Sequence, residues 1–205
     1  MDILKRATTK NGNEIKLIGE KGKEKILVIG VFHAEEPQGK YLIDEYLKNH
    51  ISNLLFIPCL NPDGMSKNER TNGNGVDLNR NYPTKNWELT EKGQYFGGES
   101  PASEIETKFV IESLEEYRPK AIVTLHSPYK IVNFDGPAKD LAQKISEIIN
   151  YPVEESIGYP TPGSFGTYCG VERNIPTITL ELDEECPVVD LLEPVHQIFD
   201  MLGKM

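Results

Sequence analysis

Three short apolar runs that end at polar side chains constrain the fold of this chain more than any other feature. Runs of this length and composition predict buried strands. Helical patterns separate the runs, so we expect an α/β fold with a mixed, mostly parallel sheet flanked by helices. The runs cover residues 25–32, 121–125 and 177–182. The first two lead to His33 and His126, and the third contains Glu181 near its end.

Several helices are expected between and after these strands. Pro37 suits the first turn of a helix, and apolar stripes predict helices over 141–149 and 188–202. Residues 103–106 read Ser-Glu-Ile-Glu and predict a capping box at the start of another helix. Pro194 predicts a kink in the last helix.

Length and charge limit the function classes. The chain has 205 residues and shows no repeat or linker, so one domain over 1–205 is expected. A net charge of -10 argues against nucleic-acid binding. No run approaches the ~20 apolar residues of a membrane span. The polar N-terminus and an odd count of three cysteines predict a cytoplasmic protein with reduced thiols.

A metal site is expected where the strands end. Ligands of α/β sheets lie beyond the carboxyl ends of the strands, where His33 and His126 fall. A carboxylate from Glu35 or Glu36 could join them, and spacing alone does not choose between the two. Zinc takes such nitrogen and oxygen ligands. The simpler interpretation is a strand-end histidine with a glutamate favoured by a helix dipole. His50 and His196 are expected to be structural.

Other polar residues suit a hydrolytic site. Glu181 lies in an apolar strand, where burial raises the pKa of a carboxyl group and suits a general base. A buried ion pair is the alternative. The polar segment 61–98 carries Arg70 and Arg80, which suit carboxylate binding and oxyanion stabilisation. Tyr159 could offer its phenol to a substrate or only pack.

Taken together, these segments resemble the zinc carboxypeptidase family of metallopeptidases. The resemblance covers most of the chain, in the right order. The matching residues are His33-x-x-Glu36, Asn61-Pro62-Asp63-Gly64, Arg70, Gly75-Val76-Asp77-Leu78-Asn79-Arg80-Asn81, His126-Ser127, Tyr159 and Glu181.

The resemblance implies a role for each matching position. It implies zinc ligands at His33, Glu36 and His126, which favours Glu36 over Glu35. It implies a catalytic base at Glu181, a carbonyl-polarising arginine at Arg70, a carboxylate clamp at Asn79 and Arg80, and a substrate-covering tyrosine at Tyr159.

Within the family, the chain is most similar to the bacterial murein peptide amidases. That similarity lies in 70–83, 101–107 and 158–169. It implies a zinc-dependent cut between γ-D-glutamate and diaminopimelate in a small peptide with a free carboxylate. An ordinary metallocarboxypeptidase, an N-acyl amino acid deacylase and a non-catalytic binding module are the alternatives. The loop 160–169 is the candidate for reading the distal end of diaminopimelate.

Overall fold

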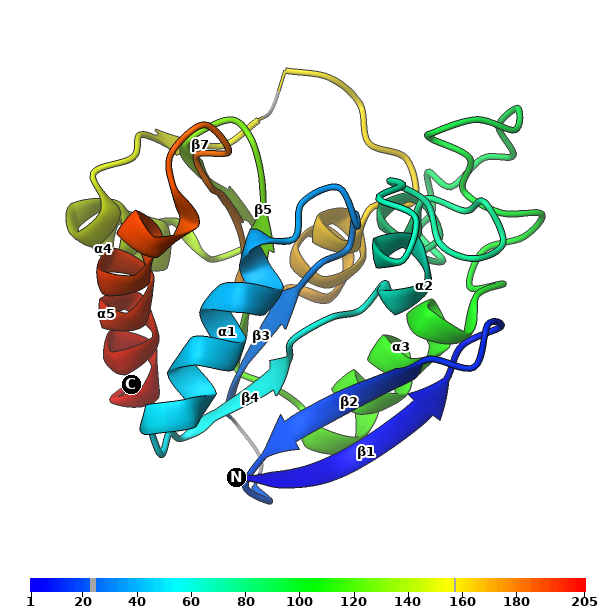
Figure 1. The fold of residues 1–205 in the computed structure, drawn as a ribbon. Coiled ribbons are helices and arrows are strands. Elements are labelled where there is room, and N and C mark those ends of the chain that lie inside the picture. The colour runs from blue at the N-terminus through cyan, green and yellow to red at the C-terminus, as the bar shows by residue number, and fades with distance from the viewer. Residues whose placement is uncertain (23–24, 157) are drawn as a thin grey trace.

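The computed structural model describes residues 1–22, 25–156 and 158–205. In these residues one mixed sheet has the strand order β1-β2-β4-β3-β5-β8-β6-β7 (Figure 1). The strands are β1 (Asp2–Thr8), β2 (Glu14–Gly19), β3 (Ile26–Gly30), β4 (Leu54–Ile57), β5 (Ala121–His126), β6 (Ile131–Asp135), β7 (Val153–Glu154) and β8 (Thr177–Glu181).

The centre of the sheet is parallel and its flanks are mixed. Strands β4, β3, β5 and β8 pair in parallel, and β6 pairs in parallel with β7. The pairs β1–β2, β2–β4 and β6–β8 are antiparallel. Every residue of β3, β4 and β5 is buried, as expected for parallel strands covered on both faces. The predicted α/β fold is therefore confirmed.

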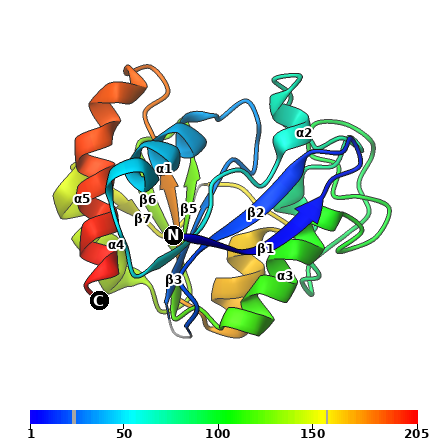
Figure 2. The ribbon, with the colours of Figure 1, turned by 60° about the horizontal axis from the view of Figure 1, so that its bottom comes forward.

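Helices cover both faces of the sheet. Figure 2 shows α1 (Gln38–Asn49), α4 (Lys139–Ile149) and α5 (Leu192–Gly203) on one face. The other face carries α3 (Ile105–Tyr117) and the π-helical turn η2 (Thr167–Val171). Each face has its own apolar core, the first containing Val28 and Phe199 and the second Ile29 and Phe109. Adjacent residues of one strand thus serve opposite cores.

Two expectations about helix ends were wrong. The capping box at 103–106 does not form, because Glu104 is the N-cap of α3 and no side chain caps the helix. The hydroxyl of Ser103 donates instead to the Glu104 carboxylate. Pro194 does not kink α5, because it lies in the first turn, where the missing N–H has no helical partner to lose. The 3₁₀ turn η3 (Val188–Leu191) precedes that helix.

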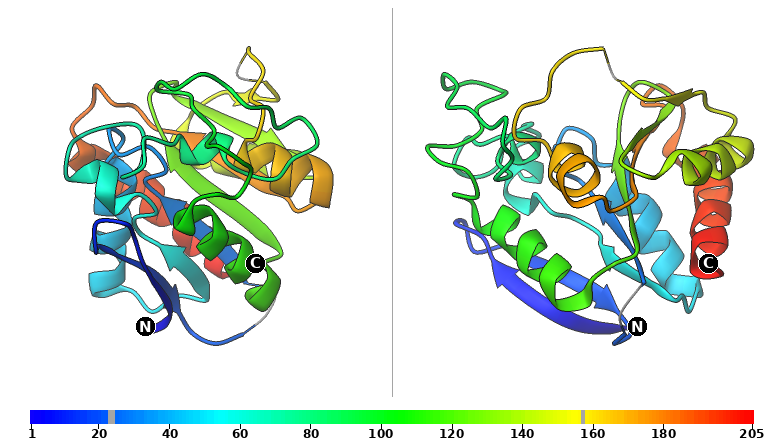
Figure 3. Two further views of the ribbon diagram at one scale, coloured as in Figure 1. Left: turned by 90° about the vertical axis from the view of Figure 1, so that its right-hand side faces the viewer. Right: turned by 180° about the vertical axis from the view of Figure 1, so that it is seen from behind.

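The polar segment 61–98 is folded against the strand ends. It contains α2 (Pro62–Met65) and the 3₁₀ turn η1 (Leu78–Arg80). Figure 3 shows this segment, in teal and green, at the same end of the molecule as the yellow segment 158–166. None of the helices in the described residues combines the length and the apolar composition that a membrane span requires.

Candidate active site

Three adjacent parallel strands deliver polar side chains to one point. His126 ends β5 and pairs in register with Glu181, which ends β8. His33 follows β3 by three residues, after a sharp turn in which Val31 takes a left-handed φ of 53°. That conformation is rare for a β-branched residue. The carbonyls of Gly30 and Val31 accept hydrogen bonds from Leu60 and Asn61, which hold the turn.

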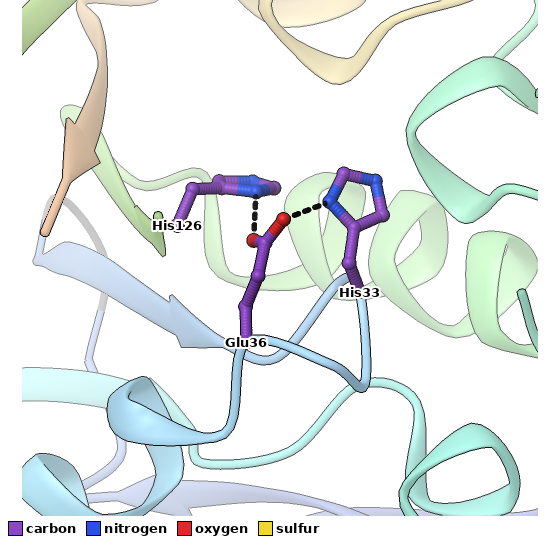
Figure 4. Close-up of side chains that lie close together, drawn as sticks. All are labelled: His33, Glu36 and His126. Atoms are coloured by element: carbon purple, nitrogen blue, oxygen red, sulfur yellow. Dashed lines mark hydrogen bonds and ion pairs between the residues drawn. The ribbon is translucent and has the colours of Figure 1, made fainter. Parts of the chain in front are cut away.

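His33, Glu36 and His126 form a compact group that could hold a metal ion (Figure 4). Their ligand atoms lie within 4.8 Å of one another, and all three side chains are buried. The Glu36 carboxylate lies between the two rings, with each histidine Nδ1 2.9 Å from one of its oxygens. Two imidazoles and a carboxylate match the donor set of a catalytic zinc site.

Asp77 fixes the first of these rings from behind. Its carboxylate lies 3.1 Å from Nε2 of His33 and accepts the Nε–H of Arg70 at 3.0 Å. It also accepts the backbone N–H of Asn79. Carboxylates that orient a ligating histidine are a recurring feature of metal sites. The sequence analysis assigned no role to Asp77, although a buried histidine at a metal site needs such a partner.

Opposite charges hold this group together. Burial alone would lower the pKa of His33, but the carboxylates of Asp77 and Glu36 raise it to about 9. Burial opposes ionisation of Glu36 as well, yet His33 and His126 lower its pKa to about 2. The carboxylates of Glu36 and Asp77 therefore stabilise a positive charge at this site. A bound metal cation would supply that charge in place of a protonated imidazole.

Glu181 lies beside the group with a free oxygen. Its side chain is 6% exposed, and Oε2 has no hydrogen-bond partner in the described structure. Burial raises the pKa of Glu181, and Glu36 adds to the rise while His126 opposes it. The expected upward shift is therefore confirmed. A buried acceptor without a partner is costly unless a ligand or water uses it.

The predicted residues line one cavity of about 500 Å³. Asn79 accepts the backbone N–H of Phe165 through its Oδ1, so its amide nitrogen remains a donor. Arg80 is buried and donates to the Asn79 carbonyl. The cavity wall includes His33, Glu36, Arg70, Asn79, Arg80, His126, Tyr159 and Glu181.

Aromatic rings stand at the mouth of the cavity. The ring of Tyr95 lies under the guanidinium of Arg70, 5.1 Å from its carbon. Tyr159 is 44% exposed at the rim. Burial, together with the neighbouring Tyr129 hydroxyl, raises the pKa of Tyr159 to about 12. Its phenol is therefore a donor at neutral pH. Tyr95 and Tyr129 were not predicted, because an isolated tyrosine in a loop carries no sequence signal.

Contacts in the structure distinguish Glu35 from Glu36 and give the roles of His50 and His196. Glu35 is half exposed and lies 3.6 Å from Arg70, so Glu36 is the carboxylate of the buried group. The rings of His50 and His196 interact with backbone carbonyls of α1, at Tyr46 and Leu42. Both histidines are structural, as predicted.

Comparison with known proteins agrees with this geometry. The family model for zinc carboxypeptidases matches residues 3–151. Murein peptide amidase A of Vibrio campbellii is 35% identical over 187 residues, covering 84% of this chain and 70% of that protein. Its counterpart in Escherichia coli K12 is 30% identical over 174 residues, with coverages of 78% and 71%.

A solved structure shows the same architecture. The crystal structure of murein-tripeptide amidase from Escherichia coli O157 superposes with a TM-score of 0.86 at 25% identity. The match covers 96% of this chain and 89% of the other. With a matching family model over most of its length, this chain belongs to the zinc carboxypeptidase family and is a hydrolytic enzyme.

Proposed function

We propose that this enzyme is a zinc-dependent amidase that cleaves the bond between γ-D-glutamate and diaminopimelate in murein peptides. The observation that carries the proposal is the buried group of His33, Glu36 and His126 beside the carboxylate of Glu181, whose Oε2 has no hydrogen-bond partner in the described residues. The names of the relatives from Vibrio campbellii and Escherichia coli supply the substrate class. Residues 1–205 are taken as one catalytic domain.

Zinc is the metal that the donor set favours. His33 and His126 would bind it through Nδ1, and Glu36 would bind it through its carboxylate. When bound, zinc supplies Lewis acidity, which lowers the pKa of water toward about 7 and polarises a carbonyl. Asp77 would keep the imidazole of His33 in the ligating tautomer by accepting its Nε2–H.

Glu181 and Arg70 would handle the proton and the charge. The carboxylate of Glu181 would accept a proton from the attacking water and deliver it to the leaving amine. The raised pKa of Glu181 brings the carboxyl group closer to the range in which it can both accept and release a proton near neutral pH. The guanidinium of Arg70, held by Asp77, would stabilise the oxyanion of the tetrahedral intermediate.

Asn79, Arg80 and Tyr159 would hold the substrate by the carboxylate of its leaving residue. The free amide nitrogen of Asn79 and the guanidinium of Arg80 line the same wall. Protonated Tyr159 can donate a third hydrogen bond from the rim. Fixing the carboxylate next to the scissile bond supplies orientation, which is a large part of catalysis.

The same geometry also suits an ordinary carboxypeptidase, so the test must distinguish an amidase from a carboxypeptidase.

We also propose a cytoplasmic location, which the free thiols of Cys59, Cys169 and Cys186 favour.

The experiment compares three amides as substrates of the zinc-loaded enzyme, before and after chelation. These are L-Ala-γ-D-Glu-diaminopimelate, a standard peptide with a C-terminal lysine, and an N-acetyl amino acid. Chelator-sensitive release of diaminopimelate, with slow cleavage of the other two, is the expected result. Preferred cleavage of the standard peptide would make the enzyme an ordinary carboxypeptidase. Preferred cleavage of the acetyl amide would make it a deacylase.

A further inference from the structure

The aromatic ring of Tyr95 lies against two arginines of the active site. Its centroid is 5.1 Å from the guanidinium carbon of Arg70 and 5.9 Å from that of Arg80. Both distances fall within the range of about 6 Å in which an aromatic ring attracts a cation. The two arginines come from different places in the loop segment 61–98, yet both lie over this one ring. One side chain is therefore placed to orient two guanidinium groups.

The chain next to Tyr95 is anchored to the rest of the loop. The carbonyl of Phe96 accepts the backbone N–H of Asp77 at 2.8 Å, and the carbonyl that follows accepts a side-chain N–H of Asn81 at 2.7 Å. The side chain of Phe96 is 5% exposed, so it fixes the segment in the protein interior. The carboxylate of Asp77 also accepts the Nε–H of Arg70. The backbone of Tyr95 is thus held in a fixed position relative to Arg70.

Arg80 has fewer partners than Arg70 and depends more on the ring. The side chain of Arg70 forms ion pairs of 3.0 to 3.8 Å with three carboxylates. None of the ion pairs of the described residues involves Arg80, whose Nη1 donates to the carbonyl of Asn79. Arg80 is 8% exposed, so water compensates its charge poorly. The electron-rich face of Tyr95 supplies part of the compensation that a carboxylate supplies elsewhere.

The contact between the ring and the two cations should strengthen when substrate binds. Tyr95 is 51% exposed and lines the active-site cavity. It also lines a second hollow of about 350 Å³, whose wall includes Arg80 as well. A substrate that fills the cavity would remove water from the ring and from the guanidinium groups. Since cation–π attraction increases on desolvation, the ring should matter most in the substrate complex.

We propose that Tyr95 is a positioning residue that holds the guanidinium groups of Arg70 and Arg80 in the orientation needed for catalysis. The inference rests on the proposed function, in which Arg70 stabilises the oxyanion and Arg80 is part of the carboxylate clamp. A flexible side chain loses rotamer freedom when it binds a ligand, and preorganisation by the ring reduces that cost. Loss of the ring should therefore weaken substrate binding through Arg80 and slow the reaction through Arg70.

The first test removes the ring and keeps an apolar side chain. Zinc-loaded Tyr95→Leu should raise KM and lower kcat for L-Ala-γ-D-Glu-diaminopimelate, with kcat/KM lowered by about 10-fold. Tyr95→Phe keeps the ring and should retain kcat/KM within about 2-fold. Tyr41→Leu, at an exposed position of α1, should behave as the wild type. Unchanged constants in Tyr95→Leu, or equal losses in Tyr95→Leu and Tyr95→Phe, would overturn the proposal.

Double variants separate the contributions of the two arginines. In an Arg70→Ala background, Tyr95→Leu should change KM alone, because no guanidinium remains to be positioned at the oxyanion. In an Arg80→Ala background, Tyr95→Leu should change kcat alone. If Tyr95 only stabilised the fold of the loop, both constants would change in both backgrounds, and that result would contradict the proposal.

A measurement without turnover distinguishes this inference from the proposed function. In NMR spectra of the zinc-loaded enzyme, the ring of Tyr95 should shift the Nε–H signals of Arg70 and Arg80 upfield, and Tyr95→Leu should remove the shift. Arg70→Lys and Arg80→Lys would assign the two signals. If no γ-D-glutamyl peptide is cleaved but Tyr95→Leu removes the shift, the proposed function fails and the positioning of the guanidinium groups holds. If the peptide is cleaved and both signals are unchanged in Tyr95→Leu, the proposed function holds and the inference is overturned.

Discussion

The two walls of the active site are built by different means. On one wall, His126 and Glu181 end neighbouring strands and are paired in register by the sheet itself. On the other wall, Arg70 and Arg80 come from the loop segment 61–98, which has no strand to fix it. The first wall is held by backbone ladders, whereas the second depends on side chains.

Buried asparagine side chains hold the loop segment by hydrogen bonds to its backbone, as the backbone ladder holds the strands. Asn81 is fully buried, donates to the carbonyls of Gly97 and Ser100 and accepts the N–H of Glu104. Asn72 accepts the N–H of Val76. Each amide replaces backbone hydrogen bonds that a loop cannot make for itself. We therefore expect the structure of the loop wall to depend on single polar side chains, and the structure of the strand wall to depend on core packing.

The largest effect is expected on the strand wall. His126→Ala removes one of the three proposed ligands, so metal should be lost and peptide hydrolysis should fall by at least about 10³-fold. Metal analysis after dialysis, together with initial rates, would measure both. His196→Ala, which removes a structural histidine, should keep its metal. Full metal occupancy in His126→Ala would contradict the ligand assignment.

The next effect tests the loop wall. Asn81→Ala removes the acceptor of the Glu104 N–H and a donor to the carbonyls of Gly97 and Ser100, which should cost about 3 kcal/mol of unfolding free energy. Urea denaturation would measure the loss. Asn86→Ala, at an exposed position, should cost about 1 kcal/mol or less. Similar losses in the two variants would mean that the buried amide does not hold the loop.

A smaller effect is expected where the two walls meet. Asp77→Asn weakens the support that the loop gives to His33, and metal affinity should fall by about 10- to 100-fold. Competition with a fluorescent zinc chelator would measure the affinity. The matched variant Glu35→Gln, at a half-exposed carboxylate near Arg70, should bind zinc as the wild type does. Unchanged zinc affinity in Asp77→Asn would show that the loop wall does not support metal binding by His33.

The smallest expected effect is a pH dependence of the unfolding free energy that arises from Glu106, which lies in α3. Burial, together with nearby Glu104 and Asp63, raises the pKa of Glu106 from 4.5 to about 7. The folded state then binds more protons than the unfolded state between these values, so stability falls as pH rises from 4.5 to 7. The fall should amount to about 2 kcal/mol. Metal-free Glu106→Gln should lack it in urea titrations across this range. Parallel curves for the variant and the wild type would exclude Glu106 as the cause.

The sequence predicted the strand wall better than the loop wall. His33, His126 and Glu181 follow apolar runs, so the edge of a parallel sheet brings them together without knowledge of any contact. The N-terminal hairpin of β1 and β2 was missed, because its charged, alternating residues give no continuous apolar run.

The loop wall depends on contacts between residues far apart in the chain. Asn81 bonds to Gly97 and Ser103, and Asn79 bonds to Phe165, which no local pattern predicts. Buried polar groups are identified by what surrounds them, and that information is tertiary.

The most direct test of the central account is the rate of diaminopimelate release by zinc-loaded Glu181→Gln. The account predicts one bound zinc and a rate lowered by about 10³-fold or more, because the amide can neither accept nor return the proton. A zinc-loaded variant that cleaves L-Ala-γ-D-Glu-diaminopimelate at the wild-type rate would contradict the assignment of Glu181 as the base.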